Sequence, residues 1–349
     1  MKPIQTEDRD IIADIRRLTH RANRNNITRT QAYLAFFQNH SEVHWALLAH
    51  LVSRNGGWNM TDLHGEWLPR LMTAAEIKNY FWFLERCNWL IFHDAYAQLL
   101  LYEKMKRTGQ DLTALLVDLG VSVFMQPIWQ SFLHTKDSVR LTRALIINEQ
   151  QYIEQRVVDK PFAEQQIFFS LAFFTQSILS LNQVIFPYKE HPTDRRLHAC
   201  GISVHRFPSV TQRIDIGKTL YQLLFDNPVR LQSIYEWARR IPHTGSRADY
   251  WPHLFTPRKP ASETDGRYLP RFEGKELIAG APKLYSPQVS SVWPDQEHPP
   301  ADGTDWYQGE NWQTALEARA DLPTLDEDQY IRSLRMIEWG VKFVQAFRP

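Results

Sequence analysis

The strongest constraint on the fold is a long segment with helical periodicity that begins near Thr73. Thr73 and Glu76 have the spacing of a capping box, in which two side chains satisfy backbone groups at a helix start. Beyond them, apolar residues recur three and four positions apart, which buries one face of a helix. The pattern continues to about Arg107 and stops before Gly109, a residue suited to a helix C-terminus. We therefore predict a helix here, with a break near Cys87 because the segment is unusually long.

Helix-start signals of the same kind recur along the rest of the chain. They occur at Thr28, Ser41, Thr73, Asp137, Asn227 and Asp326. The helix that follows Ser41 is expected to run from Glu42 to Arg54 and to stop at the glycine pair 56–57. Residues 202–207 alternate like a strand, but one short strand makes no sheet. These patterns predict an all-α fold, built as a single compact multi-helix domain.

Composition excludes several other classes of protein. The 349 residues are 43% hydrophobic and 13% aromatic, which rules out a disordered chain. Two cysteines, Cys87 and Cys200, are too few for a disulfide scaffold or a Cys-rich zinc module. A formal net charge of +1 argues against a generally basic coat for nucleic acid. The first ten residues carry acids where a signal peptide has an apolar core, so we predict a cytoplasmic protein.

One uncharged stretch tests the expectation that no membrane is involved. No residue from Gln165 to Tyr188 is charged, and this length is sufficient to span a bilayer. However, Gln176, Asn182 and Gln183 lie inside it, and amides in hydrocarbon need partners from other spans. No second span exists in the sequence. We therefore predict a buried helix in the middle of a soluble bundle, with no membrane partner.

The character of the chain changes after residue 251. Nine of the 20 prolines lie between Pro252 and Pro300, among scattered glycines. Aromatic residues remain dense in this segment, which is typical of a chain that docks onto a surface. We predict a helical core over residues 1–251, an irregular Pro- and aromatic-rich wrapping arm over 252–308, and C-terminal helices over 309–349 that pack back on the core.

The densest polar cluster lies in residues 21–30 and 44–62. We predict a small-ligand pocket lined by Arg29, His50, Arg54, Asn55, Asn59 and Asp62. Two arginines could clamp a carboxylate or phosphate group with paired hydrogen bonds. The alternative is a structural corner between two helices, in which arginine and aspartate pair while asparagine and threonine satisfy free backbone groups.

Several short motifs in this region also resemble a known family. Residues 25–33, Asn-Asn-Ile-Thr-Arg-Thr-Gln-Ala-Tyr, resemble the opening signature of the uncharacterised YppC-like proteins of bacilli. The segments 44–46, 48–50, 53–55 and 60–63 continue the resemblance, which is strongest over residues 20–65 and extends over the rest of the chain. The family carries no assigned activity. The resemblance therefore implies a soluble bacterial protein, and it supplies no catalytic residues.

Two further motifs invite chemical interpretations. His93-Asp94 is the dipeptide that HD phosphohydrolases use to hold a divalent metal, but no other part of their pattern is recognisable and the position also suits a hydrogen-bonded core histidine. Gly217-Lys218-Thr219 resembles the end of a phosphate-binding loop, but Gln212 stands where the first glycine belongs. We predict no metal site, and the sequence indicates no particular cofactor.

The charge distribution supports a second hypothesis. Residues 195–259 hold 11 Lys+Arg and 4 acids among several aromatic residues, and residues 295–328 hold 10 acids and one arginine. Arginine with aromatic residues can bind single-stranded nucleic acid, although no nucleic-acid-binding motif is visible. The best hypothesis is a protein that binds a small anionic ligand in the polar N-terminal pocket, with or without catalysis. The alternative is a non-catalytic interaction or nucleic-acid-binding protein that uses residues 195–259.

Overall fold

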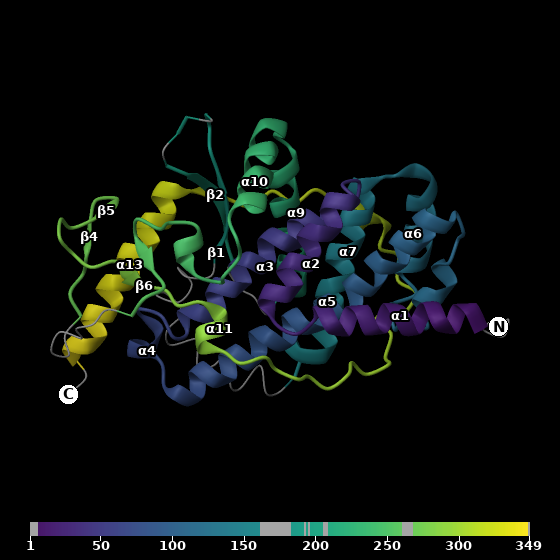
Figure 1. The fold of residues 1–349 in the computed structure, drawn as a ribbon, viewed down its shortest axis with the longest axis horizontal. Helices are drawn as coiled ribbons and strands as arrows, with labels where there is room; N and C mark the ends of the chain where they lie inside the picture. The colour runs from purple at the N-terminus through teal and green to yellow at the C-terminus, as the bar shows by residue number, and fades with distance from the viewer. Residues whose placement is uncertain are drawn as a thin grey trace.

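A helical bundle built around one long helix forms most of the molecule (Figure 1). The computed structural model describes residues 6–160, 183–191, 193–194, 196–204, 209–259 and 268–347. The α-helices are α1 (Thr6–Ala22), α2 (Asn26–Asn39), α3 (His44–Asp62), α4 (Leu68–Leu71), α5 (Ala74–Thr108), α6 (Met125–Thr135), α7 (Ser138–Ile153), α9 (Val210–Phe225), α10 (Pro228–Arg240), α11 (Val289–Val292), α12 (Gln313–Glu317) and α13 (Glu327–Phe347). Short turns of other helix types are η1 (Thr113–Leu116), η2 (Glu154–Val158) and η4 (Arg247–Asp249). Helices α1, α2, α3 and α7 all pack against α5.

The ends of α5 are confirmed, but its predicted break is not. Thr73 and Glu76 form the capping box, and Gly109 ends the helix in the left-handed conformation that favours glycine. Between them the helix is continuous over 35 residues, including Cys87. Its apolar face is buried along the whole length, so tertiary packing holds a helix far longer than average. The predicted starts of α7 and α10 are also confirmed, with Asp137 and Asn227 as N-caps.

The polar corner between α2 and α3 differs from the prediction. Helix α2 begins at Asn26, with Asn25 as the cap, and α3 continues through the glycine pair to Asp62. Gly57 explains the difference, because a Cβ atom there would lie 2.5 Å from Asn26 Oδ1 and 2.8 Å from His243 Cε1. The glycine permits close packing of two other segments against α3. Its low helix propensity is therefore outweighed by tertiary contacts.

The all-α prediction is wrong, because the structure also contains small β-sheets. Strands β1 (Gln183–Tyr188), β2 (His198–Ser203) and β7 (Thr324–Asp326) form an antiparallel sheet in the order β1-β2-β7. Two more pairs are β3 (Phe255–Thr256) with β6 (Leu284–Tyr285), and β4 (Phe272–Glu273) with β5 (Glu276–Leu277). The fold is largely helical with a minor β component.

The sheet was missed for a physical reason. Strand β1 is buried at five of its six positions, so its residues read as part of an uncharged run rather than as an alternating strand. The alternating segment predicted at residues 202–207 overlaps β2 only at Ile202 and Ser203, and β7 follows β2 by more than a hundred residues. Gly201 makes the pairing possible, because a Cβ there would lie 2.1 Å from Val184 O. The remainder of the predicted buried helix, residues 165–182, lies outside the described residues.

The Pro-rich segment is fixed to the bundle at several points. Trp293 stacks on Phe81 with 3.7 Å between ring centroids and donates a hydrogen bond to Met60 O. Farther along, Trp306 Nε1 donates to Asn148 Oδ1 at 2.9 Å. Figure 1 shows the segment after α11 passing along the bundle toward α1. The division of the chain at residues 251 and 308 stays a prediction.

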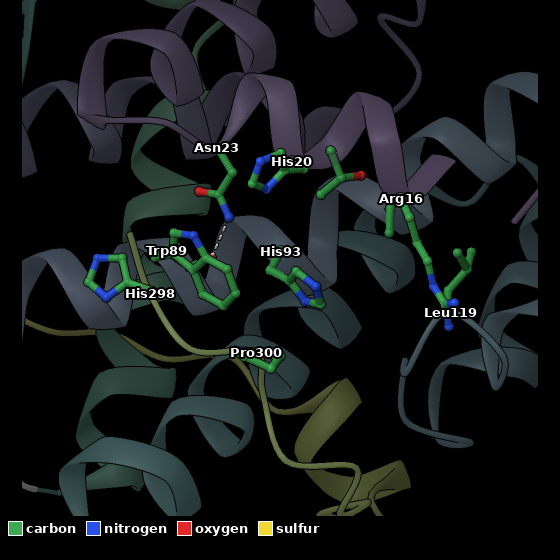
Figure 2. A pocket seen from close by; sticks show the side chains of 10 residues that line it. Arg16, His20, Asn23, Trp89, His93, Leu119, His298 and Pro300 are labelled. Carbon is green, nitrogen blue, oxygen red and sulfur yellow. Dashed lines mark hydrogen bonds between the residues drawn. The ribbon is translucent and has the colours of Figure 1, made fainter. Parts of the chain in front are cut away.

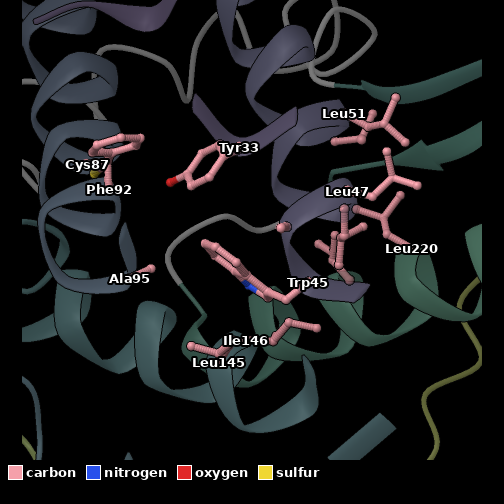
Figure 3. Close-up of a cluster of buried hydrophobic side chains, with 14 of the residues drawn as sticks. Tyr33, Trp45, Leu47, Leu51, Cys87, Phe92, Ala95, Leu145, Ile146 and Leu220 are labelled. Atoms are coloured by element: carbon pink, nitrogen blue, oxygen red, sulfur yellow. The ribbon is translucent and has the colours of Figure 1, made fainter. Parts of the chain in front are cut away.

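The core is continuous from the bundle to α13. Figure 3 shows its centre, where Tyr33, Trp45 and Phe92 converge from α2, α3 and α5. Trp45 and Phe92 are almost fully buried, as are Tyr330 and Ile337 of α13. Among the described residues, no helix has the length and apolar character needed to cross a bilayer.

Candidate functional site

The predicted pocket residues Asp62 and Arg29 are both occupied by internal ion pairs. The Asp62 carboxylate accepts hydrogen bonds from Arg247, with Nη2 to Oδ2 at 2.7 Å and Nε to both oxygens at 3.0–3.1 Å. Arg247 also donates to Tyr330 OH at 2.6 Å. Burial alone would lower the pKa of Arg247, but Asp62 and Tyr330 hold this pKa above its usual value. Arg29, 1% exposed, contacts Glu85 with 2.5 Å between Nη2 and Oε2.

Arg54 is buried against the end of α10. Its guanidinium donates to the backbone oxygens of Ile241 at 2.8 Å and Pro242 at 3.2 Å. It also stacks on Trp237, with 4.2 Å from Cζ to the ring centroid. A cation that satisfies free carbonyl groups at a helix C-terminus stabilises that helix end. This geometry gives Arg54 a structural partner for most of its donors.

The remaining predicted residues point to different neighbours. Asn55 pairs with strand β1, because Ile185 N donates to its Oδ1 at 2.8 Å and its Nδ2 donates to Ile185 O at 3.1 Å. His50 Nδ1 lies 2.8 Å from Thr30 O, and burial followed by the charge of Arg54 lowers the pKa of His50 to about 3. Asn59 is half-buried, with Oδ1 left without a hydrogen-bond partner. Five of the six residues therefore have partners that join α2 and α3 to each other or to α5, α10, β1 and η4, and the predicted pocket in this corner stays a prediction.

The structure also contains a cavity in another part of the helical bundle. It lies between α1, α5 and the Pro-rich segment, with a volume of about 330 Å³ (Figure 2). That volume falls within the range of small-molecule sites. Its lining residues are Arg16, Thr19, His20, Asn23, Trp89, His93, Ala97, Leu119, His298 and Pro300. Four separate stretches of the sequence, at residues 16–23, 89–97, 119 and 298–300, thus supply one site.

Several polar atoms of the cavity lining have no hydrogen-bond partner. They are Thr19 Oγ1, His93 Nδ1 and both ring nitrogens of His298. Thr19 is 2% exposed, and the His298 side chain is also 2% exposed. Buried polar groups are nearly always hydrogen-bonded, so a group of unsatisfied atoms on one cavity wall indicates that something else completes their bonding.

The cavity lining is basic. It contains one guanidinium and three imidazoles, and no carboxylate. Arg16 and His20 are exposed, while Thr19 is 2% exposed. Burial, and after it the charge of Arg86, lowers the pKa of His93 to about 4, so this ring is neutral at pH 7. In the part of the chain that the structure describes, no three His, Cys, Asp or Glu side chains are grouped to hold one metal ion.

Glu85 connects the cavity to the buried ion pair beneath it. Its Oε2 binds Arg29, while Oε1 has no hydrogen-bond partner and lies 3.9 Å from His298 Nε2. Burial raises the pKa of Glu85, but Arg29 and His298 together hold it below its usual value. A charged carboxylate therefore stands behind His298 and can orient its ring.

Comparison with known proteins identifies the family. The family model described as a protein of unknown function, DUF2515, matches residues 21–331. The chain belongs to the DUF2515 family. It is 38% identical over 333 residues to the uncharacterized protein YppC of Bacillus subtilis (strain 168), covering 94% of this chain and 93% of that protein. No solved structure matches it. The predicted resemblance is confirmed, and it brings no assigned function.

Of the histidines and the arginine that line the cavity of this DUF2515 chain, the sequence analysis singled out only one, His93, and it did so as a possible metal ligand. His93 was noted as half of a metal-binding dipeptide, yet adjacent residues on a helix point about 100° apart. Asp94 accordingly faces the core, where its Oδ2 accepts from Gln98 and Asn148 at 2.7 and 2.6 Å. Arg16, His20 and His298 carried no sequence signal, because only the folded chain brings their segments together.

The basic region 195–259 of this DUF2515 chain is largely committed to internal contacts. Arg213 pairs with Glu154, and Arg247 pairs with Asp62. Of its seven aromatic residues that the structure describes, five are at most 7% exposed, namely Tyr221, Trp237, Tyr250, Trp251 and Phe255. Aromatic rings must be accessible to stack with nucleic-acid bases. The described part of this region therefore lacks the exposed rings that such binding needs.

Proposed function

We propose that this protein binds a small anionic molecule in the cavity between α1, α5 and the segment that carries His298. The ligand belongs to the carboxylates or phosphates of metabolite size. The observation that carries the proposal is a set of buried polar atoms at the cavity wall that have no hydrogen-bond partner among the described residues, namely Thr19 Oγ1, His93 Nδ1 and His298 Nδ1. The anionic ligand foreseen from the sequence is retained, and its site moves from the α2–α3 corner to the neighbouring cavity.

The negative charge of the proposed ligand follows from the residues that line the cavity. The exposed side chains of Arg16 and His20 supply donors, and no carboxylate is present to repel an anion. Hydrogen bonds from charged donors to carboxylate or phosphate are stronger than those between neutral groups. Inside the cavity, the Thr19 hydroxyl and the neutral His93 ring offer further donors at positions that are now unsatisfied. Arg16 would repel a cation, and the Glu85 carboxylate behind His298 is already paired with Arg29.

Isothermal titration calorimetry of the full chain with inorganic phosphate and with citrate tests the proposal. We expect saturable binding of at least one probe, with one site per chain. Arg16→Gln should weaken binding about tenfold, because a hydrogen bond to a charged group contributes about 1.5–3 kcal/mol. The folded state should persist, since Arg16 is exposed and its guanidinium donates only to Asp118 O.

Arg17→Gln is the matched control. Arg17 is the next residue of α1, its side chain is 63% exposed, and it pairs with Asp14 on the outer surface rather than lining the cavity. Binding to this variant should match the unmodified protein. Equal weakening by the two substitutions, or no saturable binding of either probe at millimolar concentration, would contradict the proposal.

A further inference from the structure

Helix α13 exposes a stripe of large apolar side chains. Met336, Trp339 and Phe343 are 59%, 56% and 66% exposed. They are spaced three and four residues apart, so they form one stripe along the helix. The opposite face is fully used by the fold, where Leu334, Ile337 and Val341 are completely buried. The stripe thus lies on the solvent-exposed side of the helix, away from these buried residues.

The charges beside this stripe are all positive. Arg332, Arg335 and Lys342 lie on the same outer side of α13, with Arg332 and Lys342 exposed and Arg335 half-buried. Within the residues that the structure describes, no ion pair joins any of them to a carboxylate. The one acid in this part of the helix, Glu338, is 1% exposed and accepts hydrogen bonds from Tyr268 and the backbone of Arg271. At the start of the helix, Asp328 is paired with Lys275.

The position of the helix makes the stripe accessible. Figure 1 shows α13 at the end of the molecule opposite α1, beside the β4–β5 hairpin. Leu269, which is 67% exposed, adds another apolar side chain near the end of the helix, because Tyr268 N donates to Gln345 at 2.7 Å. Lys342 lies over the Trp339 ring, with 4.7 Å from Nζ to the centroid, so the apolar and basic groups form one surface.

We propose that this surface attaches the protein to an anionic lipid membrane. Aromatic and apolar side chains beside basic residues on one helix face are typical of helices that lie at a membrane interface. Each basic residue near an anionic leaflet also contributes to binding. A second copy of this chain would fit poorly, because face-to-face pairing would bring six uncompensated positive groups together. Attachment requires no occupant of the α1–α5 cavity and stands independently of it.

Vesicle co-sedimentation of the full chain tests the proposal. We expect binding to vesicles of equal parts phosphatidylglycerol and phosphatidylcholine, and little binding to pure phosphatidylcholine. The combined substitution Arg335→Glu and Lys342→Glu should lower the partition coefficient at least about 25-fold, because each basic charge that is removed lowers it about fivefold. Salt at about 1 M should also reduce binding, because it shortens the screening length to about 3 Å.

Two further variants keep the test decisive. Arg239→Glu with Arg240→Glu is the matched control, because it reverses two exposed charges at the end of α10 and should leave vesicle binding unchanged. Trp339→Ser with Phe343→Ser should weaken binding to anionic vesicles without altering the charge. Absence of binding to anionic vesicles, or equal losses in the α10 and α13 charge variants, would overturn the proposal. So would a dimer in solution that the serine variant abolishes, because a second copy would then cover the stripe.

Discussion

Two neighbouring polar regions of this protein differ in how their hydrogen bonds are satisfied. In the α2–α3 corner, Arg54, Asn55 and Asp62 are buried and have specific partners from distant segments. At the α1–α5 cavity, Thr19, His93 and His298 have polar atoms with none. The corner is far richer in polar residues along the sequence. Buried polar atoms without a partner also occur in the corner, among them Arg29 Nε, His50 Nε2 and Asn59 Oδ1. At the second region such atoms line a cavity of about 330 Å³, and this makes it the better candidate for ligand binding.

The largest expected effect is the loss of stability when the ion pair of the α2–α3 corner is broken. Asp62→Ala leaves Arg247 buried without its carboxylate, which costs about 3–5 kcal/mol in the free energy of unfolding. Urea denaturation followed by circular dichroism measures this change. A double-mutant cycle with Arg247→Met is the control, because removing the second charge should recover part of the loss. A loss below about 1 kcal/mol for Asp62→Ala would show that the pair is not what holds this corner.

A second prediction concerns a buried carboxyl that, unlike Asp62, has no paired cation. Burial raises the pKa of Asp94 to about 7, against a weaker lowering by hydrogen bonds from Asn148 and Gln98. The folded state therefore keeps a proton that the unfolded chain releases above about pH 4, and this group lowers stability as pH rises from about 4 to about 7. Asp94→Asn mimics the protonated form.

The variant should accordingly match the unmodified protein at pH 4 and exceed its stability by about 1–3 kcal/mol at pH 8, since a tenfold change in proton affinity between the folded and unfolded states corresponds to about 1.4 kcal/mol. Urea denaturation at a series of pH values measures the difference between the two proteins, so that contributions from other groups cancel. A difference that does not change with pH would mean that Asp94 is ionised in the folded state throughout.

The smallest expected change in stability comes from replacing one threonine by valine in each of the two regions. Thr61→Val in the corner removes hydrogen bonds to Gly245 O at 2.7 Å and Trp58 O at 3.1 Å, and should cost about 1–2 kcal/mol. Thr19→Val at the cavity removes a hydroxyl with no partner, so unfolding free energy should stay unchanged or rise by about 1 kcal/mol. Thermal denaturation of both variants measures the contrast. Equal destabilisation would mean that the Thr19 hydroxyl is already satisfied and would weaken the case for the cavity.

The two regions also show which predictions from sequence succeed. Capping residues act within one turn, so Thr73 with Glu76, Asp137 and Asn227 located their helix starts correctly. The prediction that α3 ends at its glycine pair was wrong, because Gly57 allows close contacts with Asn26 and His243, which belong to other segments. Strand β1 was missed because a separate strand, β2, supplies the hydrogen bonds that define it.

The sequence by itself determined the family, the largely helical character and the local ends of most helices that carried capping signals. These depend on residue identity, on periodicity and on interactions within a few positions. Only the tertiary structure decided that Arg29 and Asp62 are held by Glu85 and Arg247, and that His20, His93 and His298 line one cavity. The physical reason is that satisfaction of a buried polar atom depends on which distant groups come within about 3 Å of it, and no local pattern encodes that distance.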